Sequence, residues 1–431
     1  MGLDERSWET IASDSVLLKA VGNWRENSEK WLEYSIERLN ETVRVNPLRE
    51  DIVWVENWLE EIGGTKIEWF TGVGSAWNLP FPRGKAEGDV KIILSALHET
   101  GRLTRQEAVS MIPAIVLDAK PGELVLDMCA SPGSKTTQIA EHLEGSGIVM
   151  ANEIASSRIN TLVANVKRHG SITPIITHHD GRFIPKVPET GFDKILVDAP
   201  CTGSATTRKN PDVWKKWLPS GGKSLHKLQL ELLLKAINLT KPGGKIVYST
   251  CSLDPVENEA VISEVLRLSK EISLVPMSEK LVDLPGRCGM TDWPQLDDSG
   301  NIIESSKIVK SMLPPTDIDI KEELKKCLRI WNDDVKAGGF FVAVLKKEEE
   351  YVEKIVDFDK IIEPEKVKPD EINFPQPISS KIEDMILDTL GWDEKNLWIR
   401  GKSILWSTPE AREIWESDRS KRSGRTFIPG K

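Results

Sequence analysis

The amino-acid sequence predicts an α/β protein whose centre is a doubly wound, mostly parallel sheet, with smaller modules before and after it. The prediction depends on short apolar runs, on amphipathic segments between them, and on their alternation from about residue 123 to residue 345. Short apolar runs are typical of buried strands, and longer segments with helical periodicity are typical of helices. Their alternation indicates a parallel sheet with helices on both faces.

Six segments carry the strand pattern, and each is rich in aliphatic or aromatic residues. In chain order they are ELVLDM (123–128), GIVMANE (147–153), TPIITHHD (173–180), DKILVDAP (193–200), GKIVYSTC (244–251) and GFFVAVL (339–345). The intervening segments KTTQIAEHL and KLQLELLLKAI have the apolar spacing of amphipathic helices. We therefore assign residues 96–347 to one central domain.

Tryptophan is concentrated in the predicted N-terminal module, residues 1–95. Its tryptophans are Trp8, Trp24, Trp31, Trp54, Trp58, Trp69 and Trp77. The stretches Trp24–Leu39 and Ile52–Ile62 have apolar residues at helical spacing. These indoles would either fill a small separate core or form platforms on which nucleic-acid bases stack. We favour the separate core.

The composition changes after Lys346. Residues 346–371 are mostly charged, and residues 348–375 are expected to form a linker. A small C-terminal module, residues 376–431, is predicted to follow. It has an apolar segment at 382–390, ends in the basic tail Arg419–Lys431, and contains Trp392, Trp398 and Trp406.

Composition excludes several classes of protein. The chain of 431 residues carries a net charge of −10, which does not by itself indicate a nucleic-acid partner, although a local basic face would suffice for one. No apolar run approaches the roughly 18 residues of a membrane span, and no signal peptide is apparent, so we expect a cytoplasmic or nuclear protein. We also expect it to be a monomer. The cysteines form no CxxC pair, which argues against disulfides and against a zinc site, and no metal is expected. They are Cys129, Cys201, Cys251, Cys288 and Cys327.

The first predicted strand runs into CASPGSKTTQ (129–138), where a tight turn at Pro132 and Gly133 opens a helix. A helix N-terminus that faces a ligand favours negative or polar groups. The segment is neither a Walker A loop nor a GxGxxG loop, because its glycine and lysine are spaced differently. We therefore expect a nucleotide-like ligand that is not an ATP phosphate chain.

Three of the predicted strands end in acidic residues, and two end in cysteines. Glu153, Asp180 and Asp198 are expected at the ligand-binding edge of the sheet, where carboxylates commonly bond ribose hydroxyls. Cys201 and Cys251 follow the fourth and fifth strands. If these strands are neighbours, both thiols face one reacting atom, so we favour a chemical role over packing.

The segments MCASPGSKTTQ, VDAPCTG and YSTCSLDPVENEAVI resemble motifs of the Nop/Sun family of RNA cytosine-5 methyltransferases, which use S-adenosylmethionine. RQEAVSMIP (105–113), RKNPDVWKKW (208–217) and CLRIWNDDVKAGGFFVAVLKK (327–347) resemble its tRNA-modifying branch. The resemblance is close over residues 100–347. It is weaker over 1–99, where only RVNPLR (44–49) matches, and weakest beyond 350. It implies a Rossmann-like methyltransferase fold that acts on tRNA.

The resemblance also assigns roles to residues of this chain. It implies that Cys251 is the nucleophile, that Cys201 assists release of the product, and that Asp198 lies beside the donor's methionine end and the target base. Lys135 is expected to reach the base as well. The predicted donor site comprises Cys129, Ala130, Ser131, Pro132, Gly133, Ser134, Lys135, Glu153, Arg158, Asp180 and Asp198. Two positions depart from the family pattern, since Glu153 replaces an aspartate and Ala205 a glycine.

The implied reaction explains why two thiols are needed. Cytosine C5 is a poor nucleophile until a thiolate adds at C6, and a base must then remove the C5 proton so that the enzyme is released. The target base must also leave its stack to reach the pocket. RNA contacts are expected from the N-terminal module, from the basic tail and from a basic stretch interleaved with Trp214 and Trp217. The basic residues of that stretch are Arg208, Lys209, Lys215 and Lys216.

Two other functions remain open from the sequence. One is an rRNA cytosine-5 methyltransferase of the same family, because one sequence does not settle the RNA class. The other is a noncatalytic RNA-binding assembly factor on the same fold. The assembly factor is disfavoured because both cysteines, Asp198 and the donor loop (residues 129–135) are intact.

Overall fold

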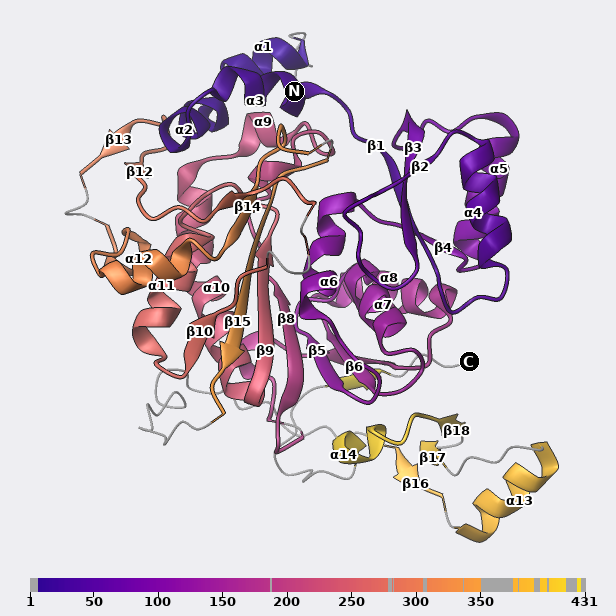
Figure 1. Cartoon of the computed structure of the whole chain (residues 1–431). Coiled ribbons are helices and arrows are strands. Elements are labelled where there is room, and N and C mark those ends of the chain that lie inside the picture. Colours follow the sequence, from indigo (N-terminus) through magenta and orange to yellow (C-terminus); the bar gives the residue numbers. More distant parts are fainter. Residues whose placement is uncertain are drawn as a thin grey trace.

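The computed structural model describes residues 7–186, 188–277, 281, 283–304, 308–335, 337–349, 375–378, 380–390, 396–400, 403–415 and 425–427. Most of the predicted linker 348–375, Trp392, and the basic tail apart from Arg425–Phe427 lie outside these residues. Figure 1 shows the central sheet between two groups of helices, with the N-terminal elements at one end and the C-terminal module at the other.

Five parallel strands form the middle of the sheet, in the order β9-β8-β5-β6-β7. They are β5 (Leu124–Asp127), β6 (Ile148–Asn152), β7 (Pro174–His178), β8 (Phe192–Asp198) and β9 (Thr240–Thr250). All five correspond to predicted strand segments, so the α/β fold class is confirmed.

Antiparallel strands extend this sheet on both sides. The sixth predicted segment forms β15, which pairs antiparallel with β9, and the C-terminal β19 pairs antiparallel with β7. These flanking strands are β10 (Ile272–Leu274), β11 (Arg287–Cys288), β14 (Leu328–Ile330), β15 (Phe340–Lys347) and β19 (Arg425–Phe427).

Helices cover both faces of the sheet. Leu124 and Leu126 of β5 belong to the core beneath α10 and α11, whereas Val125 belongs to the core beneath α6 and α7. This alternation is the period of two expected of a strand buried on both faces. The helices are α6 (Ile112–Leu117), α7 (Ser134–His142), α8 (Ser156–His169), α10 (Pro219–Leu239), α11 (Glu259–Leu268) and α12 (Ile318–Leu324).

The tryptophans of the N-terminal module do not share one core, contrary to the prediction. The first three helices pack against the central domain, where Trp24 meets Trp217 edge-on at 5.7 Å between ring centroids and Trp31 meets Trp214 at 5.5 Å. Trp54, in contrast, is 54% exposed. The helices are α1 (Trp8–Ser13), α2 (Val16–Trp24) and α3 (Ser28–Ile36). Asn27, with φ at 59°, separates the last two.

A separate antiparallel sheet follows, with strand order β2-β3-β1-β4 and two helices on one face (Figure 1). Its elements are β1 (Asn40–Val45), α4 (Ile52–Glu61), β2 (Thr65–Lys66), β3 (Ser75–Pro82), α5 (Gly88–Glu99) and β4 (Leu103–Arg105). This is the ferredoxin-like βαββαβ arrangement. The predicted boundary at residue 95 therefore falls inside α5, because β4 still pairs with β1.

The two faces of this small sheet have different partners. Val43, Trp77 and Leu79 belong to a core with α4 and α5. Arg44 and Ala76 alternate with them and lie against the central domain, where Arg44 is fully buried. The ferredoxin-like unit is therefore fixed to the central domain by the face that its own helices leave open.

The C-terminal module forms a small sheet with two helices. Trp398 and Trp415 pack edge-on with 4.7 Å between ring centroids, and Thr408 donates to the carbonyl of Gly147 at 3.0 Å, which joins the module to the central domain. Its elements are β16 (Gln376–Pro377), α13 (Ser380–Leu390), β17 (Leu397–Arg400), β18 (Ser403–Trp406) and α14 (Ala411–Trp415).

The shorter elements connect these parts and are α9 (Val213–Lys216), β12 (Gln295–Leu296) and β13 (Ile302–Ile303). Among the described helices, none has the length and apolar character needed to cross a bilayer.

Candidate active site

The loop that follows β5 leads directly into the N-terminus of α7. Gly133 has φ at 107°, and a Cβ there would lie 2.9 Å from the Leu162 side chain, so this turn requires glycine. Thr136, in the first turn of α7, donates to Asp127 at 2.6 Å. Burial raises the pKa of Asp127 to about 7, against the opposing effect of that hydrogen bond. Sequence reasoning did not single out Asp127, which links the end of β5 to α7.

Lys135 and Asp198 form an ion pair between α7 and the end of β8. The Lys135 ammonium lies 2.7 Å from one oxygen of Asp198, and the Ser249 hydroxyl donates to the other oxygen at 2.8 Å. Burial acts to lower the pKa of Lys135, but the charge and hydrogen bond of Asp198 outweigh it and raise that pKa. Lys135 is therefore a cation, and it holds the Asp198 carboxylate in one orientation.

The two cysteines predicted to meet do so. Because β8 and β9 are adjacent and parallel, Cys201 and Cys251 follow neighbouring strand ends, and their sulfur atoms lie 3.4 Å apart. The amide of Ala205 also donates to the carbonyl of Cys251 at 3.1 Å. This spacing allows both sulfurs to act on one bound base.

The surroundings distinguish the thiols. The adjacent Cys251 sulfur, together with burial, raises the pKa of Cys201 well above its ordinary value. Burial likewise raises the pKa of Cys129, and the charge of Asp127 adds to the effect. Cys129 and Cys201 therefore stay protonated near neutral pH. Cys251 lies near the Lys135 ammonium.

The predicted donor residues Glu153, Arg158 and Ser131 form one cluster beside the loop. The Glu153 side chain is 3% exposed, accepts from the amide of Ala155 at 2.8 Å, and lies 3.5 Å from the Arg158 guanidinium. Arg158 donates to the carbonyl of Ser131 at 2.6 Å. The Glu153 carboxylate therefore lies at the end of β6, and Arg158 connects it to the loop that follows β5.

Asp180, at the end of β7, is engaged by its neighbour Arg182. The guanidinium donates to both carboxylate oxygens, at 3.0 and 2.7 Å, and the Arg182 amide also donates at 3.0 Å. Burial acts to raise the pKa of Asp180, but these hydrogen bonds outweigh it and lower that pKa. Asp180 is therefore ionised, and a ligand at this point would share it with Arg182.

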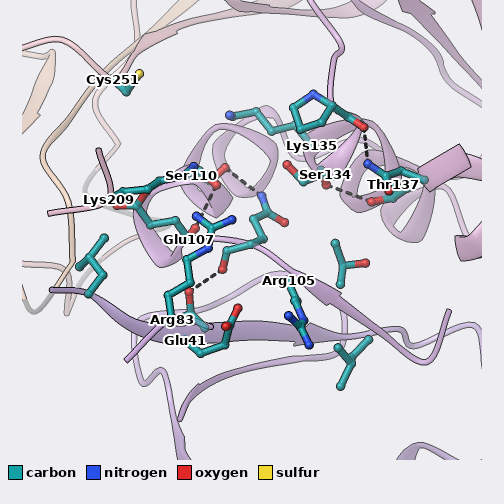
Figure 2. Close-up of a pocket in the computed structure, with 18 of the residues that line it drawn as sticks. Glu41, Arg83, Arg105, Glu107, Ser110, Ser134, Lys135, Thr137, Lys209 and Cys251 are labelled. Atoms are coloured by element: carbon teal, nitrogen blue, oxygen red, sulfur yellow. Dashed lines mark hydrogen bonds between the residues drawn. The ribbon is translucent and has the colours of Figure 1, made fainter. Parts of the chain in front are cut away.

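A cleft of about 330 Å³ opens beside the thiols and extends between the ferredoxin-like unit and the central domain. In Figure 2, Cys251 lies at one end, Arg105 lies at the other, and Lys135 borders the space between them. The cations Arg83, Arg105 and Lys209 line the cleft, and the buried Nε of Arg105 has no hydrogen-bond partner among the described residues. Sequence reasoning missed Arg83 and Arg105, because only the docking of the two sheets brings them to the cleft that contains Cys251.

The basic stretch predicted to bind RNA is divided by the fold. Arg208 is a correction: its guanidinium is buried and donates to the carbonyls of Glu37 and Ala337, at 3.1 and 3.0 Å, so it is not available to phosphates. Trp214 and Trp217 are also buried and offer no stacking platform.

Three lysines of that stretch stay exposed, but only one borders the cleft. Lys209 lines it, whereas Lys216 pairs with Asp212 at 2.7 Å and Lys215 lies over the Trp8 ring at 4.9 Å. Among the described residues, no group of His, Cys, Asp or Glu could hold a metal ion.

A parallel sheet with carboxylates at three strand ends and a glycine turn leading into a helix is typical of α/β proteins that bind a nucleotide-like ligand at the strand ends. Residues 114–346 match the family model described as 16S rRNA methyltransferase RsmB/F. The chain belongs to this family, which confirms the Nop/Sun resemblance seen in its motifs.

Relatives and solved structures agree with this assignment. The tRNA (cytosine(49)-C(5))-methyltransferase of Pyrococcus abyssi is 37% identical over 335 residues, which are 75% of this chain and 93% of that protein. The multisite-specific tRNA:(cytosine-C(5))-methyltransferase of Saccharomyces cerevisiae is 40% identical over 304 residues, or 64% of this chain, but only 44% of its own length is spanned. A crystal structure of a methyltransferase homolog from Pyrococcus horikoshii superposes with a TM-score of 0.58, at 30% identity over 76% of this chain and 93% of that one.

Proposed function

We propose that this protein forms 5-methylcytosine in tRNA, using S-adenosylmethionine as methyl donor and acting as a monomer in the cytoplasm, or in the nucleus of a eukaryotic cell. The observation that carries the proposal is the pair of sulfur atoms 3.4 Å apart beside the Lys135–Asp198 ion pair. The tRNA names of the Pyrococcus abyssi and Saccharomyces cerevisiae relatives support the choice of RNA.

The residues at the strand ends fit the donor. Its ribose diol needs an acceptor, and Glu153 offers a carboxylate at the end of β6, whereas its adenine would face Asp180 beyond β7. The turn at Gly133 brings the N-terminus of α7 to the same edge of the sheet. When bound, S-adenosylmethionine supplies an electrophilic methyl group.

The chain's own groups account for the remaining steps. The Cys251 thiolate adds to C6 of the base, so that C5 becomes nucleophilic and takes the methyl group. The Asp198 carboxylate, fixed by Lys135 and Ser249, accepts from the cytosine amino group and stabilises the adduct. A base then takes the C5 proton, and Cys201, whose sulfur lies 3.4 Å from that of Cys251, assists release of the product. Loss of that proton expels the Cys251 thiolate and restores the aromatic ring.

Transfer to purified RNA tests this function. The protein and donor would be incubated separately with unmodified tRNA transcripts and with fragments of small-subunit rRNA, followed by bisulfite sequencing. We expect new 5-methylcytosine in tRNA alone. Methylation confined to rRNA would show that the substrate is rRNA and not tRNA, in agreement with the description of the family. No methylation, with donor binding also absent, would support an assembly factor.

Replacing Glu153 by Ala is expected to weaken donor binding. A charged hydrogen bond contributes about 1.5–3 kcal/mol, so affinity should fall roughly tenfold or more. Glu153→Asp, which keeps the carboxylate, should retain most of the binding. Calorimetry with the donor measures both, and unchanged affinity in Glu153→Ala would remove this residue from the donor site.

The cleft cations are expected to carry the salt dependence of RNA binding. Replacing Arg83, Arg105 and Lys209 together by Ala should reduce the slope of log affinity against log salt by up to about 0.9 for each duplex phosphate that these cations neutralise. The matched control replaces Lys215 and Lys216, which are exposed outside the cleft. A slope that changes only in the control would move the RNA path from the cleft to α9.

A further inference from the structure

The loops that carry the two thiols are joined through one buried carboxylate. Glu257 is fully buried, and its side chain lies between the loop after β8 and the loop after β9. One oxygen accepts from the amide of Thr202 at 2.9 Å, and the other accepts from the hydroxyls of Thr202 and Ser252, both at 2.5 Å. Thr202 follows Cys201 and Ser252 follows Cys251, so each thiol is one residue from a bond to Glu257.

A second hydrogen-bond path reinforces this connection. Gln229 of α10 donates to Glu257 at 3.0 Å and to the carbonyl of Pro200 at 2.9 Å, just before the first thiol. The Tyr248 hydroxyl donates to the Glu257 carbonyl at 2.6 Å, which fixes the backbone of Glu257 against β9. Glu257 itself is therefore held from α10 and from β9.

A buried carboxylate is costly unless its oxygens are satisfied, and here four donated hydrogen bonds satisfy them. No neutral side chain of similar size accepts four hydrogen bonds. Loss of the carboxylate would leave buried donors on both loops without an acceptor. The loops would then be free to separate, and the distance between the sulfurs would change.

We propose that Glu257 is a positioning residue that sets the spacing of Cys201 and Cys251. Its side chain is fully buried, does not line the cleft, and acts through the two loops. The inference deepens the proposed function and rests on it for the catalytic role of the spacing. The spacing itself is a property of the protein alone.

A probe of paired thiols tests the spacing without RNA or donor. Phenylarsine oxide joins two neighbouring thiols through its arsenic and releases one water. All variants carry Cys288→Ser, which removes the exposed thiol. In this background we expect one phenylarsine oxide to bind tightly by bridging Cys201 and Cys251. Cys201→Ser and Cys251→Ser should each abolish the bridge. Glu257→Ala should bind the arsenical at least about tenfold more weakly, while iodoacetamide still alkylates each thiol singly.

Asp193→Asn is the matched control. Asp193 also joins two strands, accepting from the amide of Leu124 and from Lys241, both at 2.8 Å, but at the opposite end of the sheet. This variant should lose stability and keep the arsenical bridge. Loss of the bridge in both variants would mean general loosening of the fold and would overturn the proposal.

Kinetics with methylatable RNA form the second arm. A misplacement of about 1 Å can reduce a rate roughly 100-fold, so kcat of Glu257→Ala should fall by about that factor while the affinities for RNA and donor stay unchanged. Glu257→Gln keeps the side-chain volume and one acceptor oxygen, so it should fall between wild type and Glu257→Ala in both arms. It also serves as the readout if Glu257→Ala does not fold.

The two arms separate the possible failures. If Glu257→Ala or Glu257→Gln binds phenylarsine oxide as tightly as wild type and has the wild-type kcat, the positioning role is overturned. A lost bridge in Glu257→Ala, in a wild-type protein that methylates no RNA, would support the spacing role and refute the proposed function instead.

Discussion

Cys251→Ser is expected to abolish both methyl transfer and covalent capture of RNA, with a loss of activity of roughly 10⁴-fold or more. A serine hydroxyl is a much weaker nucleophile than a thiolate, and Lys135 does not replace it as an attacking group, because its ammonium is paired with Asp198. Cys201→Ser should behave differently. It should still form the adduct but release it slowly, so that an enzyme–RNA species accumulates.

Denaturing electrophoresis with labelled RNA and donor distinguishes the two variants, because only a covalent adduct survives it. Cys288→Ser, which changes an exposed thiol on β11, is the control and should behave as wild type. Trapped RNA in Cys251→Ser, with none in Cys201→Ser, would reverse the roles. Full activity in both variants would refute the thiol mechanism.

Arg44→Met is expected to be the most destabilising single change in the interface between the ferredoxin-like unit and the central domain. The guanidinium is fully buried and donates to both oxygens of Glu141, at 2.6 and 3.1 Å, and to Thr137 at 3.1 Å. Removing one partner of a buried ion pair leaves an uncompensated charge and costs about 3–5 kcal/mol. Urea denaturation should show the free energy of unfolding reduced by about this amount.

A second substitution separates the effect of the missing charge from that of altered packing. Arg44→Met combined with Glu141→Leu removes both charges and should recover part of the stability. A double variant less stable than Arg44→Met would show that packing dominates.

Acid gives an independent check of this ion pair. Burial acts to raise the pKa of Glu141, but Arg44 and His169 outweigh it and lower that pKa below the ordinary 4.5. The stability that this depressed pKa contributes is complete above pH 4.5 and is lost as the pH falls through the folded-state value. Arg44→Met should therefore lose less stability on acidification than wild type does, and equal losses would contradict the role of Arg44.

The sequence predicts the central sheet well because its strands are short apolar runs. Such runs can be identified from the local sequence, without information about the segments they pair with. Strand direction is different. GFFVAVL has the composition of a strand buried on both faces, but β15 pairs antiparallel with β9 and β14. Composition does not distinguish the two directions, since both leave the side chains buried.

The site shows the same division between local and distant information. Cys201 and Cys251 were predictable because strand ends converge at one edge of a parallel sheet. Arg208 was not, because the carbonyls that bury its charge come from residues 37 and 337, far along the chain. Trp24 and Trp217 likewise meet across nearly two hundred residues, so neither segment alone indicates that its indole is part of a core.

The strand β19 has a consequence for the synthesis of this protein. It covers the outer edge of β7, pairing Arg425 with His178, Thr426 with Thr177 and Phe427 with Ile176. The ribosome synthesises these residues after the rest of the catalytic sheet. Until they emerge, the outer edge of β7 has no strand paired with it. Uncovered edges are templates for pairing with another chain. Expression of a version ending before Arg425 should therefore yield more aggregated protein than the full chain, even though it retains both thiols and the donor loop.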